Sequence, residues 1–139
     1  SYYFKKNRQE YYDRLNMVRN TGNYEQWVDF FLKGVVDIAG SAMDTARQIL
    51  ELQSRHRRLL WERKISSPIA VGILEQLFYT PVVSIGQTAV QFDISYQAAS
   101  TIVSQLENAG ILRETTGKKR DKRFVYNDYL EILTEGTKI

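Results

Sequence analysis

The 139-residue chain has no cysteine and a single histidine, His56. The absence of cysteine excludes disulfides, thiol nucleophiles and cysteine-ligated metal sites, and it fits a cytoplasmic location. The chain has neither a cysteine nor a second histidine that could join His56 in a metal site or in a nucleophile–histidine pair. We therefore predict no metal site, and we place His56 on the solvated face of a helix.

Long apolar runs are also missing. No stretch approaches the ~20 apolar residues that a membrane helix requires, and the first eight residues lack the core of a signal peptide. We therefore expect no membrane partner. The carboxylates are scattered along helices without an acid–base pair, so we predict no catalytic residue and no cofactor for this chain. The chain does not begin with Met, so we expect it to start inside a longer protein or after processing.

Positive charge is scarce in the second half of the chain, except on one strip. Residues 1–65 carry 12 basic and 8 acidic residues, whereas residues 66–139 carry 7 and 8. No Lys or Arg occurs between residues 66 and 112, yet residues 113–123 hold six basic residues and two acidic ones. Such a strip can bind phosphate, although the acidic surroundings do not strengthen its field.

The first 65 residues predict helices. Apolar residues recur at helical spacing from residue 2 to about 20, and Gly22 is a stop signal. Asn23 with Gln26 resembles a capping box for a long helix that bends near Gly40 or runs to about Lys64. Its basic end, residues 55–64, could extend a nucleic-acid surface, but we interpret it as a solvated helical face. The aromatic residues of the two helices exceed what the helices can bury against each other, which indicates one side of a larger core.

Ser66-Ser67-Pro68 marks a boundary, after which the pattern changes. The second part predicts, in order, a helix over 69–77, an extended piece at 82–83, a helix capped by Ser84, a turn at Asp93 and a helix capped by Ser95. Strands at 111–115 and 124–126 flank a basic loop, and Asp128 caps a last helix that Gly136 ends. This order is typical of a winged helix-turn-helix. We therefore predict a mainly α chain: a helical hairpin or bundle over 1–65, then a winged helix-turn-helix with a small β-hairpin wing over 66–139.

In a helix-turn-helix, the third helix enters the major groove of DNA with its N-terminal side chains on base edges. The wing would contact phosphate or the minor groove. The DNA-binding residues predicted here are Ser95, Tyr96, Gln97, Ser100 and Thr101 on the helix, with Ser104 one turn further, and Lys118, Lys119, Arg120, Lys122 and Arg123 on the wing. The alternative is a winged helix used for protein contact, dimerisation or target presentation, since its recognition helix carries no basic residue.

Three segments of the first part and three of the second resemble the C-terminal region of bacterial Fic-family proteins. They are Tyr-Phe-Lys-Lys-Asn-Arg at 3–8, Tyr-Tyr-Asp-Arg-Leu at 11–15, Trp-Val-Asp-Phe-Phe-Leu-Lys-Gly-Val at 27–35, Gly-Ile-Leu at 110–112, Thr-Gly-Lys-Lys-Arg at 116–120 and Tyr-Leu at 129–130. In that family, the last helices of the catalytic core are often followed by a winged helix. The resemblance thus assigns residues 1–65 to the end of a Fic-like core.

Fic proteins typically transfer AMP from ATP to a hydroxyl group of a target protein. Their His-Pro-Phe-x-x-Gly-Asn-Gly-Arg loop is absent here, and we expect it to lie upstream of Ser1. The resemblance therefore implies that this chain is the non-catalytic, regulatory C-terminal part of a protein adenylyltransferase. ATP and Mg²⁺ are implied only for the missing part. The expected partners are double-stranded DNA and the missing Fic core, with a second copy in a homodimer as a further candidate.

Overall fold

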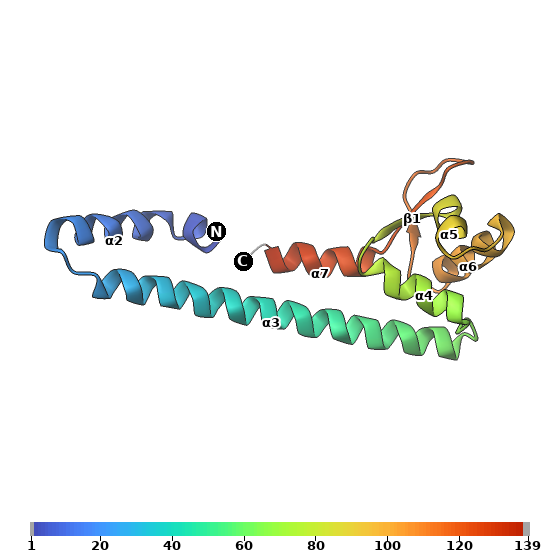
Figure 1. The fold of residues 1–139 in the computed structure, drawn as a ribbon, viewed down its shortest axis with the longest axis horizontal. Helices are drawn as coiled ribbons and strands as arrows, with labels where there is room; N and C mark the ends of the chain where they lie inside the picture. The colour runs from blue at the N-terminus through green and yellow to red at the C-terminus, as the bar shows by residue number, and fades with distance from the viewer. Residues whose placement is uncertain (1, 138–139) are drawn as a thin grey trace. The chain divides into compact units, whose positions relative to one another are not determined.

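The computed structural model describes residues 2–137, and they divide into two compact units. The first unit comprises residues up to Arg47 together with the segment from Leu133 onward, and the second comprises Gln48–Ile132. Two helices contribute to both units: α3, Glu25–Glu62, and α7, Asn127–Thr137 (Figure 1). The chain is mainly helical with one small antiparallel sheet, as the sequence predicts.

The first unit contains α1, Tyr2–Lys6, and α2, Arg8–Thr21, followed by the long helix α3. Gly22 ends α2 in the left-handed conformation (φ 67°), and its N–H donates to the Val18 carbonyl oxygen at 2.9 Å. Asn23 Oδ1 then accepts the Glu25 N–H at 3.0 Å. The Gln26 side-chain oxygen instead accepts from Arg14 at 3.3 Å. The first helical bond runs from the Val28 N–H to the Tyr24 carbonyl oxygen at 2.9 Å, so Asn23 lies one residue before the cap position, and its predicted capping box with Gln26 was wrong.

Aromatic rings fill the space between α1, α2 and the start of α3. The Phe4 ring centroid lies 5.2 to 6.4 Å from five other rings, contributed by Tyr3, Tyr11, Trp27, Phe30 and Phe31. Phe30 is the only large apolar side chain in this unit that is buried among the described residues. Gly34 lies under the Tyr3 ring, where an added Cβ would fall 2.6 Å from two ring carbons.

The second unit contains the predicted winged helix-turn-helix. Its elements are α4 (Pro68–Leu77), β1 (Val82–Ser84), α5 (Ile85–Gln91), α6 (Tyr96–Asn108), β2 (Arg113–Glu114), β3 (Arg123–Val125) and the start of α7. The strands are antiparallel in the order β1-β3-β2, with Val83 opposite Phe124 and Arg113 opposite Val125. The wing is the loop between β2 and β3, residues 115–122, together with Arg123 at the start of β3.

Three serines fix where the helices of this unit begin. The hydroxyl oxygens of Ser67, Ser84 and Ser95 accept the backbone N–H three residues on, at 3.1 to 3.2 Å. Between α5 and α6, Asp93 adopts the left-handed conformation (φ 51°) that the tight turn requires. These local signals confirm the predicted order and type of the elements.

The core of the second unit also takes in the end of α3. Leu52 and Leu60, which the sequence analysis grouped with the preceding helices, are fully buried beside the winged-helix residues. The other members of this core are Ile65, which precedes the winged helix, and ten side chains within the winged helix. These ten are Ile73, Leu74, Leu77, Val83, Val103, Leu106, Ile111, Leu112, Phe124 and Tyr126. The compact unit is therefore the winged helix together with the part of α3 that starts at Gln48.

Two helix boundaries differ from the sequence analysis. The helix α7 begins at Asn127, so Asp128 lies in its first turn instead of capping it, and the helix continues through Gly136 to Thr137. The helix α3 agrees with one of the two predicted alternatives, since it continues through Gly40 to Glu62. A glycine in a helix costs only about 1 kcal/mol relative to alanine, which packing of the surrounding turns can outweigh.

Candidate nucleic-acid interface

The exposed start of α6 carries the polar side chains that could meet a nucleic acid. Tyr96 is 61% exposed, and Gln97 beside it is also exposed. Ser95 Oγ is occupied as the helix cap, since it accepts the Ala98 N–H at 3.1 Å. Thr101 Oγ1 donates to the Gln97 carbonyl oxygen at 3.0 Å, so its lone pairs stay available as acceptors.

The wing is shaped by one carboxylate, Glu114 at the end of β2. Its Oε1 accepts the backbone N–H groups of Thr116 and Gly117 at 2.8 and 3.0 Å, together with the Thr116 hydroxyl. Arg123 N–H in turn donates to the Thr116 hydroxyl oxygen at 3.3 Å. These hydrogen bonds, with that of the Thr116 side chain foremost, lower the pKa of Glu114 below its usual range. A negative charge at this position thus closes the turn that presents the basic loop.

A hollow of about 440 Å³ lies between α6 and the wing. Tyr96, Ser100 and Ser104 line it from the helix. Four basic residues line it from the wing: Lys119, Arg120, Lys122 and Arg123. Because α6 and the wing face the same space, a ligand seated there would meet aromatic, hydroxyl and cationic groups together.

Six of the ten predicted DNA-binding residues line this hollow, and so does Ser104. The other four lie outside it: Ser95, Gln97, Thr101 and Lys118. All four are exposed, Ser95 at the cap of α6, Gln97 and Thr101 on the helix and Lys118 in the wing loop.

The hollow also holds two acidic residues that the sequence analysis did not single out, Glu107 and Asp121. A carboxylate repels phosphate but can accept a hydrogen bond from the cytosine amino group. Glu114 was missed as well. The sequence Glu-Thr-Thr-Gly at 114–117 could have indicated this role. A carboxylate two and three residues before the N–H groups of a turn can accept hydrogen bonds from them.

A second group of polar side chains is buried inside the second unit. His56 is only 5% exposed, so its predicted solvated position was wrong. Its Nδ1 lies 2.7 Å from the Tyr126 hydroxyl oxygen, and its Nε2 lies 3.5 Å from Asp128 Oδ2. The helical spacing of the sequence could not reveal this, because both partners lie about 70 residues further along the chain.

Burial controls the protonation of this group. It lowers the pKa of His56, although Asp128 acts in the opposite direction. Burial also raises the pKa of the Tyr126 hydroxyl well above its usual value. Both groups are therefore neutral at physiological pH. A neutral imidazole with one tyrosine partner, enclosed in a core, is a structural arrangement with no access for a substrate.

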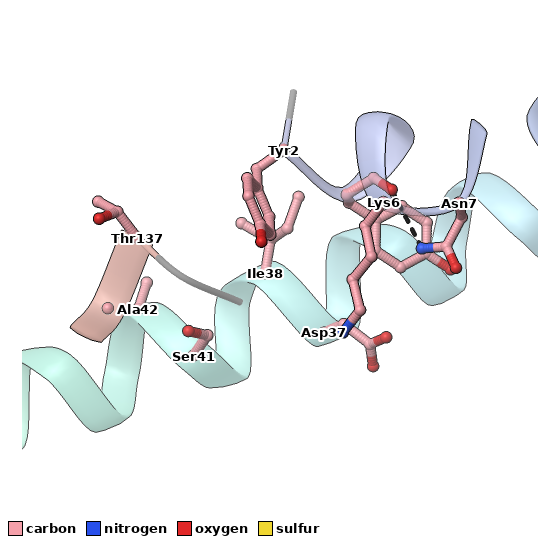
Figure 2. A pocket seen from close by; sticks show the side chains of 10 residues that line it. Tyr2, Lys6, Asn7, Asp37, Ile38, Ser41, Ala42 and Thr137 are labelled. Atoms are coloured by element: carbon pink, nitrogen blue, oxygen red, sulfur yellow. Dashed lines mark hydrogen bonds between the residues drawn. The ribbon is translucent and has the colours of Figure 1, made fainter. Parts of the chain in front are cut away.

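Another hollow, of about 510 Å³, lies in the first unit (Figure 2). Tyr2, Ile38 and Ala42 supply apolar walls, and Lys6 and Asp37 bring opposite charges to it. The Asn7 side-chain amide is already engaged, since it donates to the Tyr3 carbonyl oxygen at 3.0 Å. Nothing in this arrangement resembles an acid–base pair or a set of metal ligands.

Within residues 2–137, no cluster of three or more His, Asp or Glu side chains is arranged to hold a metal ion. None of the helices in that range combines the length and apolar character needed to span a bilayer. No family model matches the chain, and no curated protein is significantly similar to it.

Proposed function

We propose that the second unit binds double-stranded DNA. The observation that carries the proposal is the shared hollow, in which the exposed start of α6 and four basic side chains of the wing face one space. A DNA duplex offers both kinds of partner at that spacing: base edges in a groove and phosphates along its rim. In this mode α6 enters the major groove and the wing lies along the backbone.

Each part of the site has a separate role in this proposal. Lys119, Arg120, Lys122 and Arg123 neutralise phosphates and supply most of the affinity. Gln97 is suited to a bidentate contact with adenine, and the Tyr96 ring offers an apolar surface to a thymine methyl group. Glu107, in the same hollow, excludes phosphate from its own neighbourhood and so helps to fix the orientation of the duplex.

The test is fluorescence anisotropy of the chain with labelled duplex DNA at several salt concentrations. We expect affinity to fall linearly on a log–log plot, with a slope of about −0.9 for each phosphate contacted. The triple variant K118A/K119A/R120A should lose most of this binding. The matched control is K5A/R19A/R58A, which removes the same charge from exposed positions outside the wing. The absence of binding at low salt, or an equal loss in both variants, would overturn the proposal.

We also propose that this chain is the non-catalytic C-terminal part of a bacterial, cytoplasmic Fic-like protein adenylyltransferase. The support is the resemblance of residues 3–8, 11–15 and 27–35, together with the half-exposed aromatic and apolar side chains of the first unit, which a further part of the core would cover. Mass spectrometry of the protein from its source tests this. A longer chain with the His-Pro-Phe-x-x-Gly-Asn-Gly-Arg loop upstream is the expected result, and a chain without that loop refutes it.

A further inference from the structure

The face of α6 that lines the hollow beside the wing carries a row of hydroxyl groups. Tyr96, Ser100 and Ser104 follow one another at intervals of four residues, and all three line the hollow. Side chains four residues apart lie on one face of a helix, about 6 Å from one another along its axis. One tyrosine and two serine hydroxyl groups can thus reach a single ligand in the hollow.

The cationic side chains that line the hollow from the wing have no acidic partner. Within residues 2–137, every ion pair joins residues outside the wing, so none neutralises Lys119, Arg120, Lys122 or Arg123. The two serine hydroxyl groups of the row likewise have no hydrogen-bond partner in that range. A ligand with several negative charges can pair with the cations and accept hydrogen bonds from the hydroxyl groups at the same time.

Two carboxylates in the same hollow restrict the kind of anion that fits. Glu107 and Asp121 line it together with the cations. A bare chain of phosphates would be repelled by both carboxylates and offers them no hydrogen-bond donor. A nucleotide offers donors of two kinds, the hydroxyl groups of its sugar and the N–H groups of its base, which a carboxylate can accept. The carboxylates thus favour a nucleotide over phosphates alone.

An accessible aromatic ring and the size of the hollow agree with such a ligand. Tyr96 is 61% exposed and lines the hollow, so its ring is open to stacking with a base. Every base has a flat aromatic face, so such stacking does not depend on one particular base. The volume of about 440 Å³ lies within the range of about 300–1,000 Å³ that is typical of small-molecule sites.

We infer that the hollow between α6 and the wing binds a nucleotide with two or more phosphates. Its phosphates lie among the four cations and the serine hydroxyl groups, and its base stacks on Tyr96. Glu107 and Asp121 accept hydrogen bonds from its sugar or base. The nucleotide takes up the cations that are proposed to neutralise DNA phosphates, so it should displace DNA. This competition, unlike the nucleotide binding itself, rests on the proposed function.

Isothermal titration calorimetry of the 139-residue chain at constant ionic strength tests the inference, with GTP, tripolyphosphate and guanosine as ligands. We expect GTP to bind about 10-fold more tightly than either of the others, because tripolyphosphate lacks the base and sugar and guanosine lacks the phosphates. The absence of GTP binding at about 1 mM overturns the inference. So does tripolyphosphate that binds as tightly as GTP, since the wing then attracts polyanions without a nucleotide site.

Two pairs of variants locate the site. Y96A should weaken GTP binding by about 10-fold and leave tripolyphosphate binding unchanged, because only the stacking is lost. Its matched control is Y79A, which removes a ring that is 85% exposed and lies outside the hollow. K119A/R120A should weaken the binding of both ligands, whereas K5A/R19A removes the same charges from exposed positions in the first unit and should not. Equal effects within either pair would overturn the inference.

All the substituted side chains are exposed, and circular dichroism establishes that each variant keeps its helices. Displacement of labelled duplex DNA by GTP then separates this inference from the proposed function. A chain that binds GTP but not DNA supports the inference and refutes the DNA proposal, and a chain that binds DNA but not GTP does the reverse. If both bind, GTP should raise the apparent dissociation constant of the duplex. An unchanged DNA affinity at saturating GTP would place the nucleotide away from the wing and overturn the inference.

Discussion

His56 Nδ1 lies 2.7 Å from the hydroxyl oxygen of Tyr126, although 70 positions separate the two residues along the chain. The carboxylate of Asp128, 3.5 Å from Nε2, favours the tautomer with its proton on that nitrogen. Nδ1 is then an acceptor, and the tyrosine hydroxyl donates to it. This single hydrogen bond links α3 to the junction of β3 and α7 inside the second unit.

Replacing Tyr126 with phenylalanine should destabilise the second unit by about 1–3 kcal/mol, because the buried Nδ1 of His56 would lose its donor. The volume of the core hardly changes, so the loss reports on the hydrogen bond. Urea unfolding followed by circular dichroism measures it. The same substitution at Tyr79, which is 85% exposed, is the control and should have almost no effect. An equal effect at both positions would contradict the assigned role of the hydrogen bond.

Acid should destabilise the second unit through the same histidine. Burial lowers the pKa of His56 in the folded chain, whereas the unfolded chain titrates near 6.5. The unfolded state therefore binds the proton first, and the stability present above pH 6.5 is lost as the pH falls through that value toward the folded pKa. Because His56 is the only histidine, unfolding free energies at pH 7.5 and 5.5 isolate its contribution.

The variant D128N sharpens this test. The Asp128 carboxylate favours the protonated imidazole, so its removal should lower the pKa of His56 further and enlarge the loss of stability between pH 7.5 and 5.5. A variant that lacks the imidazole, H56F, should show a nearly flat profile over the same interval. A wild-type profile that is equally flat would be inconsistent with a buried neutral histidine.

The elements of the winged helix could be predicted from sequence because their signals are local. Ser84 and Ser95 mark helix starts through hydrogen bonds that span three residues, and Asp93 and Gly110 adopt the positive φ angles of turns. Apolar residues that recur every three or four positions then assign each helix its buried face. Such features require no knowledge of the rest of the fold.

Contacts between residues that are far apart in the sequence could not be predicted from such local signals. Burial of His56 follows from the placement of Tyr126, and Leu52 and Leu60 join the winged-helix core only once α3 lies against it. In the candidate site, the basic wing was visible as a cluster of charge. The placement of Glu107 and Asp121 in the same hollow was not, because it depends on how the wing folds over α6.

Removing the carboxylate of Glu114 should disorder the wing. E114A takes away the acceptor for the N–H groups of Thr116 and Gly117, so these amides should exchange with solvent faster, as hydrogen–deuterium exchange would reveal. Affinity for DNA should fall even though the net charge becomes more positive. The control is E135A, which removes the same charge from an exposed position outside the wing and the hollow. Unchanged exchange at residues 116 and 117 would refute the proposed role of Glu114.

Two glycines of α3 should respond in opposite ways to alanine. At Gly34 the new Cβ would lie 2.6 Å from the ring of Tyr3, so the ring must move and the aromatic cluster should lose stability. At Gly40 nothing lies within 4 Å, and alanine should stabilise the helix by about 0.5–1 kcal/mol. Thermal unfolding of both variants measures the difference. A stabilised G34A would mean that the Tyr3 ring does not pack against this glycine.

The proposed DNA contacts separate into positioning and reading contacts, which single substitutions distinguish. K119A removes one phosphate contact, so binding should weaken about equally on all sequences and the salt slope should become shallower by about 0.9. Q97A removes a contact to a base edge. It should leave the slope unchanged and reduce the preference for one base pair by about 1–3 kcal/mol. Anisotropy titrations on a selected site and on its single-base variants measure both quantities. An equal weakening by Q97A on the selected site and on all its single-base variants would mean that Gln97 contacts the backbone, and that α6 does not read sequence through it.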